Sequence, residues 1–231
     1  MSIPVLLTHG YGASRAMWEP NLDALGADRE VITWDLPGHG TTGATDGFSH
    51  DEAVAAMAAL LDDAGAERAV VGGMSLGGYL SLRFHLAHPD RVAALLLVDT
   101  GPGYRNDDAR DGWNAWAGGL ADDLEHDGLG ALPGGPEKDV DHAQGPAGLA
   151  AAARGILTQR DAAVIESLPD VGVPTLIVVG SEDEPFLAAA DAMERRIPDA
   201  RKVVIEGAGH AANMDAPDEF NAVVRDFLED V

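Results

Sequence analysis

The sequence predicts an α/β fold in which helices cover both faces of a parallel sheet. Short aliphatic and β-branched runs alternate with longer helical patterns over most of the chain, which is typical of parallel strands joined by right-handed crossovers. The runs are apolar almost without interruption, as expected of strands that are buried on both faces. A chain of 231 residues is long enough for one such domain with a sizeable core.

Six strands are expected, because six short apolar runs each end in a glycine-rich or polar loop. In chain order, they are residues 3–8, 31–34, 69–73, 92–98, 174–179 and 201–205. Elsewhere, apolar residues recur at helical spacing, with polar capping residues before them or a proline after them. The expected helices are residues 17–25, 49–61, 76–88 and 216–228.

The alternation of strand and helix stops after the fourth strand. The segment that follows is rich in glycine, alanine and aspartate, and a stretch at residues 127–145 is expected to be loop because of its glycines and prolines. Its short helical patterns are residues 110–120, 146–157 and 160–168. We therefore expect a helical cap inserted over the carboxyl ends of the strands. The core would consist of residues 1–103 and 169–231, and the cap of residues 104–168.

The charge of the chain excludes some classes of partner. There are 39 acidic and 15 basic residues, for a net charge of −24, and such a surface repels nucleic acid and anionic membranes. A small-molecule substrate is the expected partner, and a monomer and a homodimer are both left open. The composition is typical of a GC-rich genome, and adaptation to high salt is the alternative explanation.

Cofactors and targeting segments are not indicated. The chain has no cysteine, which excludes disulfides, thiol nucleophiles and cysteine-ligated metals, and no His, Asp or Glu cluster has metal-ligand spacing. The first residues lack a basic start with a long apolar stretch, and the longest apolar run, residues 92–98, is too short to span a bilayer. We therefore expect a cytoplasmic protein without a metal or other cofactor.

Residues 73–77 read Gly-Met-Ser-Leu-Gly, at the junction of an expected strand and an expected helix. A serine at the apex of so sharp a turn has a strained backbone, and its hydroxyl is held away from the sheet. The helix that starts behind Ser75 offers free N–H groups and the positive end of its dipole to an oxyanion. The pattern alone is weak, because a glycine-rich turn with a structural serine reads the same way.

A nucleophilic serine needs a base and a group that orients the base. In an open parallel sheet, both are expected at the carboxyl ends of strands. Asp183 follows the fifth strand and His210 follows the sixth, and the chain order Ser, Asp, His is the one expected for this kind of turn. Glu182 and Asp99 compete with Asp183 as the acid, and helix capping is the alternative role of His210.

Four segments together resemble the α/β-hydrolase fold superfamily: residues 9–12, 35–40, 73–78 and 207–210. The resemblance covers nearly the whole chain and is strongest to small serine esterases and enol-lactone hydrolases with a helical cap. There is also similarity to SHCHC synthase, the menaquinone-pathway enzyme that eliminates pyruvate. Most relatives have two further strands before the His-Gly loop. The resemblance thus implies a three-layer α/β/α fold with about six parallel strands, without those N-terminal antiparallel strands.

The resemblance also implies roles for individual residues. His210 would take the proton from Ser75 and return it to the leaving group, while Asp183 would orient the imidazole. The backbone N–H groups of Tyr11 and Leu76 would form the oxyanion hole. The implied reaction is cleavage of a small or medium carboxylic ester, thioester or lactone through an acyl-enzyme. The alternatives are a lyase or C–C bond hydrolase that uses the same triad, and a non-catalytic receptor for a small ligand.

Five side chains are candidates for substrate contacts, and each also has a structural interpretation. Tyr11 follows His9-Gly10 in the loop after the first strand, and its side chain either lines the pocket or covers it. Trp113 and Trp116 lie three apart on one helical face, which is usual for a core but also suits the inner side of a cap. Met74 flanks the serine and Met214 follows the histidine, where either would line an apolar site or fill a gap in the core.

Two further histidines and four arginines also bear on the predicted function. His9 and His39 are expected to shape their loops rather than to catalyse. A lyase that acts on a polyanionic substrate would need basic residues in its pocket, whereas an esterase would not. The candidate arginines are Arg83, Arg105, Arg110 and Arg154.

Overall fold

The chain folds around one six-stranded sheet in a computed structural model that describes residues 2–43 and 48–231. The strands are β1 Val5–Thr8, β2 Val31–Trp34, β3 Ala69–Met74, β4 Val92–Val98, β5 Thr175–Gly180 and β6 Ala200–Ile205. Their spatial order is β2-β1-β3-β4-β5-β6, and every neighbouring pair is parallel. The predicted fold class and its six parallel strands are confirmed.

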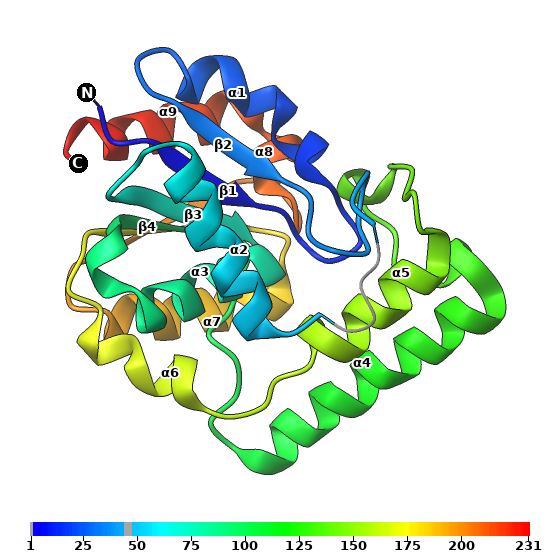
Figure 1. Cartoon of the computed structure of the whole chain (residues 1–231). Helices are drawn as coiled ribbons and strands as arrows, with labels where there is room; N and C mark the ends of the chain where they lie inside the picture. The colour runs from blue at the N-terminus through cyan, green and yellow to red at the C-terminus, as the bar shows by residue number, and fades with distance from the viewer. Residues whose placement is uncertain (1, 44–47) are drawn as a thin grey trace.

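Helices cover both faces of this sheet and make three layers (Figure 1). The layer on one face consists of α1 Glu19–Leu25, α8 Ala212–Asp215 and α9 Pro217–Glu229. The layer on the other face consists of α2 His50–Asp63, α3 Leu76–Ala87 and α7 Glu184–Arg196. Each layer buries its own apolar cluster against the sheet, which is why the strands are apolar on both sides. The sequence analysis did not assign α7.

Local sequence signals account for the helix ends. Ser49 accepts the N–H of Glu52 and the Glu52 carboxylate accepts the N–H of Ser49, so a complete capping box starts α2. Asn106 caps the helix Asp107–Asp127, the longest in the described part of the chain, and Gly128 ends it with a φ of 73°. None of the helices in the described part of the chain combines the length and hydrophobicity that spanning a bilayer requires.

The segment between β4 and β5 is helical, and most of it lies beyond the carboxyl ends of the strands, whereas its last helix packs against α3 (Figure 1). Its helices are α4 Asp107–Asp127, α5 Gly145–Ala152 and α6 Ala163–Ser167, with a π-helical turn at Ala153–Leu157. α4 is longer than the predicted helix 110–120, because Leu120 and Leu124 continue its buried stripe toward α5. The expected loop 127–145 contains two short 3₁₀ turns.

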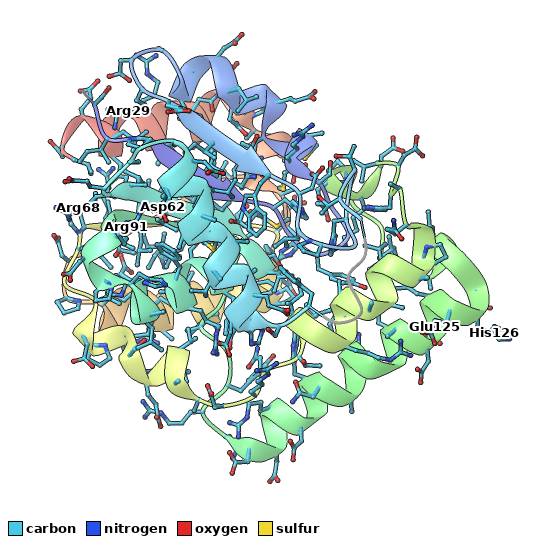
Figure 2. The ribbon with its side chains drawn as sticks, in the orientation of Figure 1. Arg29, Asp62, Arg68, Arg91, Glu125 and His126 are labelled. Carbon is cyan, nitrogen blue, oxygen red and sulfur yellow. The ribbon has the colours of Figure 1, made fainter. Side chains whose placement is uncertain are left out.

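Two arginines form hydrogen bonds at the end of the sheet where β3 and β4 begin. Arg91 binds the carboxylate of Asp62 at 2.8 Å and the carbonyl of Glu67, while Arg68 donates to the carbonyl of Val92. Figure 2 shows Arg68, Arg91 and Asp62 together, well away from Glu125 at the far end of α4. These pairs therefore stabilise the amino ends of β3 and β4 and leave the carboxyl ends free of them.

Two glycines allow the turn between β3 and α3 to lie against β1. A Cβ atom at Gly77 would be 2.1 Å from the carbonyl oxygen of Thr8, and one at Gly73 would be 2.4 Å from the same oxygen. Neither glycine has a positive φ, so space rather than backbone conformation excludes a side chain there. The close approach fixes the turn that carries Ser75 at the carboxyl end of the central strand β3.

We expect Gly77→Ala to lower the free energy of unfolding by about 3 kcal/mol, because the new methyl group overlaps backbone that must shift. Gly112→Ala is the matched control, since a Cβ atom at Gly112 in α4 meets open space. That control should gain about 0.5–1 kcal/mol through helix propensity. Urea denaturation of both variants measures the difference, and a Gly77 variant as stable as the wild type would contradict the packing argument.

Candidate active site

Three loops at the carboxyl ends of β3, β5 and β6 bring Ser75, Asp183 and His210 to one cavity. His210 Nδ1 lies 2.8 Å from Oδ2 of Asp183, and the Asp183 side chain is buried. This contact occupies Nδ1, and in the described chain Nε2 makes no hydrogen bond. In the described chain, Ser75 Oγ has no hydrogen-bond partner, so its hydroxyl is unengaged in the cavity wall.

The backbone of Ser75 is strained and firmly held. Its φ of 53° and ψ of −113° are unusual for a residue with a side chain, and such strain costs about 1–3 kcal/mol. Its N–H donates to the carbonyl of Val98 at 2.9 Å, and its own carbonyl accepts from the N–H of Tyr79 at 3.1 Å. Ser75 precedes α3 without capping it by its side chain, which leaves the hydroxyl available.

Two backbone donors accompany the serine. Leu76 is the first residue of α3, so its N–H has no acceptor within the helix. In the part of the chain that the structure describes, the N–H of Tyr11 also has no acceptor. A Cβ atom at Gly10 would be 3.5 Å from the Cβ of Ser75, so the loop that carries Tyr11 runs directly beside the serine.

The cavity has a volume of about 860 Å³ and walls that are mainly apolar. Six aromatic side chains line it: Tyr11, Tyr79, Tyr104, Trp113, Trp116 and Phe186. The Trp113 and Trp116 rings are 4.8 Å apart, and Trp113 Nε1 donates to the carbonyl of Leu157. Trp116 is 47% exposed at the edge of the cavity.

The other candidate contacts divide between cavity and core. Met74 lines the cavity beside the serine. Met214 is not among the residues that line it; it lies in α8 and packs against the apolar cluster on the α1 and α9 side of the sheet. Phe186, which the sequence analysis did not single out, stacks on the His210 ring with centroids 4.8 Å apart. Its position three residues after Asp183, in the same turn, was the available signal.

The charged groups of the cavity are few. Among the described residues that line it, Lys138 is the one lysine or arginine, and it pairs with Glu137 at 3.6 Å. None of the four candidate arginines lines the cavity. Arg83 pairs with acidic groups of α2 and the segment before α6, and Arg110 and Arg154 pair with acidic groups of α4.

Neither competing acid lines the cavity. Glu182 is exposed to solvent. Asp99 is completely buried, and its carboxylate accepts the N–H groups of Gly180 and Ala212 rather than a ring nitrogen of His210. Among the described residues, no group of three His, Asp or Glu side chains is arranged to hold a metal ion.

Three buried histidines, His9, His39 and His142, lie beside the loop that carries Tyr11. His9 donates from Nδ1 to the carbonyl of Gly10 and accepts the N–H of Leu36 at Nε2, so it shapes two loops at once. His39 lies between His9 and His142, with ring centroids 5.1 and 5.9 Å away. Burial lowers the pKa of His9 to about 4 and that of His39 well below its usual value, so these rings are neutral.

Side chains also tie the core to the segment that covers it. The Tyr11 hydroxyl donates to the carbonyl of Leu149 in α5 at 2.7 Å, and His142 accepts the N–H of Gly40. His50 Nε2 lies 2.9 Å from the carbonyl of Ile156, within reach of a hydrogen bond. The sequence offered no signal for these contacts, because they depend on how residues 104–168 fold back over the sheet.

A model of the alpha/beta hydrolase family matches residues 5–223, and the chain belongs to this family. It is an enzyme of that family, as the sequence predicted.

Two relatives and one solved structure show which kinds of protein this chain is similar to. The chain is 30% identical over 251 residues to the pimeloyl-[acyl-carrier protein] methyl ester esterase of Aromatoleum aromaticum, with 97% of each chain covered. It is 27% identical to a Bacillus subtilis protein named provisionally as a 2-succinyl-6-hydroxy-2,4-cyclohexadiene-1-carboxylate synthase, with 98% of this chain and 90% of that protein covered. The structure of a thermophilic esterase from Thermogutta terrifontis superposes with a TM-score of 0.86 and 27% identity, covering 100% of this chain and 90% of that one.

Buried His50 should make the protein sensitive to acid. Burial lowers its pKa to about 4 in the folded state, whereas an unfolded histidine titrates near 6.5. The unfolded chain therefore binds the proton first as the pH falls from 6.5 toward 4, and stability is lost over that window. We expect His50→Gln to lose about 2 kcal/mol less than the wild type between pH 8 and pH 5. Exposed His126→Gln is the control, and equal losses in all three proteins would contradict this role.

Proposed function

We propose that this chain is a serine hydrolase that cleaves a small or medium carboxylic ester, thioester or lactone through an acyl-enzyme on Ser75. One observation carries the proposal: a buried carboxylate holds Nδ1 of His210 at 2.8 Å, in the same cavity wall as a serine on a strained turn. Acyl transfer uses a nucleophile, a base and an orienting acid, and these three side chains are of the types that fill those roles.

The steps follow from the positions of these groups. Ser75 Oγ attacks the carbonyl carbon while His210 takes its proton, and Asp183 stabilises the imidazolium that forms. The oxyanion accepts hydrogen bonds from the N–H groups of Tyr11 and Leu76, each worth roughly 3 kcal/mol in comparable sites. His210 then protonates the leaving group, and water, activated by the same base, releases the acid from Ser75.

The walls of the cavity support an uncharged or weakly charged substrate. Trp113 and Trp116 lie in the helical segment 104–168 and line the cavity with other aromatic rings, so we assign that segment the role of a cap. Met74 would contact the acyl group or the leaving group beside the serine. The lyase hypothesis, which the Bacillus subtilis relative keeps open, expects several arginines in the cavity, and the four candidates are paired or placed elsewhere.

We expect Ser75→Ala to lose at least about 10³-fold in turnover of short p-nitrophenyl esters, because the nucleophile is gone. Ser167→Ala, in α6 and outside the cavity lining, is the control and should retain wild-type turnover. Chain length at the maximum of kcat/KM gives the size of the acyl site. Assays at low and molar salt also test the high-salt interpretation of the acidic composition.

A fluorophosphonate probe separates the alternatives. Labelling of Ser75 without turnover of these esters would move the proposal to lactones or to the lyase chemistry. A wild-type protein that neither turns over an ester nor is labelled would rule out a serine hydrolase and leave the small-ligand receptor.

The cavity should also discriminate by charge. We expect kcat/KM for p-nitrophenyl butyrate to exceed that for mono-p-nitrophenyl succinate at least about tenfold, since the cavity's lysine is already paired with Glu137. Glu137→Gln frees Lys138 and should narrow the difference. Faster turnover of the anionic ester by the wild type would instead favour the polyanion-binding lyase hypothesis.

A further inference from the structure

The residues that end β4 contact the backbone on either side of Ser75. The N–H of Ser75 donates to the carbonyl of Val98, the last residue of β4. Two residues further on, Thr100 Oγ1 donates to the carbonyl of Ser75 at 2.6 Å. Space for the threonine comes from Gly78 in α3, where a Cβ atom would lie 2.5 Å from the Thr100 methyl group. Both peptide groups of the strained serine are thus held by one strand end.

The next contacts reach the other two loops of the site. Asp99 Oδ1 accepts the N–H of Gly180 at 2.8 Å, and its Oδ2 accepts the N–H of Ala212 at 2.9 Å. Gly180 starts the loop that carries Asp183, and Ala212 lies two residues after His210. One carboxylate therefore joins the loop of the acid to the loop of the base.

Burying the carboxylate of Asp99 destabilises the fold more than a structural role alone would explain. It is completely buried, its φ is 43°, and no lysine or arginine of the described chain forms an ion pair with it. Burial raises its pKa to about 7. Two charged or titratable groups face it: Asp183 from the loop after β5 and His210 from the loop after β6. A buried charge without a cation destabilises the fold, so its presence calls for a functional explanation.

We propose that Asp99 and Thr100 are positioning residues that fasten the loops of Ser75, Asp183 and His210 to the end of β4. The proposal rests on the serine hydrolase function argued above. Without these contacts, the loops of Asp183 and His210 would still be joined to each other, for example by the N–H of Glu182 and the carbonyl of Ala208. Their side-chain link to the end of β4, which holds the backbone of Ser75, would be lost, so the serine would move relative to the other two groups. A displacement of about 1 Å can lower the rate of a positioned reaction about 10²-fold.

The test uses Asp99→Asn, Thr100→Val and Thr100→Ser, with p-nitrophenyl butyrate as substrate. The asparagine side chain keeps one acceptor oxygen, but its NH2 group faces the other backbone N–H, which is also a donor. One of the two loops therefore loses its hydrogen bond. We expect kcat to fall about tenfold or more while KM stays within about twofold. Thr100→Val should act in the same direction, and Thr100→Ser should restore most of kcat. Asp90→Asn, at an exposed position, is the control.

Three readouts distinguish positioning from general stability. Asp99→Asn removes a buried charge, so its thermal midpoint at pH 8 should equal or exceed that of the wild type while kcat falls. Because the pKa of Asp99 is raised to about 7 by burial, its protonation should add a decline of wild-type kcat/KM below that pH, and Asp99→Asn should lack this decline. The rate of fluorophosphonate labelling reports Ser75 reactivity without a substrate, and it should fall in both Asp99→Asn and Thr100→Val.

The outcomes separate this inference from the proposed function. A labelled, active wild type with unchanged kcat and labelling in both variants overturns the positioning role alone. Loss of kcat that follows a lower thermal midpoint and a higher KM also overturns it. A wild type that is neither active nor labelled overturns the serine hydrolase and the positioning role together. Should Asp99→Asn fail to fold, Thr100→Val and Thr100→Ser decide the matter by themselves.

Discussion

The register of the parallel sheet is the constraint on which the site depends. Backbone pairing places Met74 beside Val98, Val98 beside Val178, and Gly180 beside Ile205. Four neighbouring strands therefore end at nearly the same level, and the loops that leave them start within reach of one another. A shift of one residue in any pair would turn the side chains of that strand to the opposite face and separate the loops. The side-chain contacts of the site refine a position that the backbone ladder has already set.

Much of this arrangement could be predicted from the sequence. Strands that are buried on both faces are uninterrupted apolar runs, so their positions and the parallel sheet followed from the pattern. Chain order and strand ends also singled out Ser75, Asp183 and His210, which the structure brings to one cavity. α7 was not assigned, although Pro185 at its start and the two arginines at its end are ordinary signals of helix termini.

The remaining contacts depend on tertiary structure and had no local signal. The length of α4, the ties from Tyr11 and His50 to the covering segment, and the stacking of Phe186 on His210 all depend on how distant parts of the chain meet. Met214 illustrates the same limit. It is close to His210 in sequence, but its side chain faces the apolar cluster on the α1 and α9 side of the sheet and not the cavity. The acidic surface is likewise separate from the site, whose cavity is mainly apolar.

The covering segment leaves the fold after β4 and returns before β5, and these two strands are neighbours in the sheet. Because these strands are parallel, the chain leaves at the carboxyl end of β4 and re-enters the sheet at the amino end of β5, so the segment is part of a crossover connection. The ladder of backbone bonds between the strands does not pass through it. Evolution can exchange or reshape such an insertion while the strand ends, and the groups they carry, stay in place. A single scaffold of this kind can acquire new substrate preferences by replacing one continuous stretch of chain, without rebuilding its chemistry.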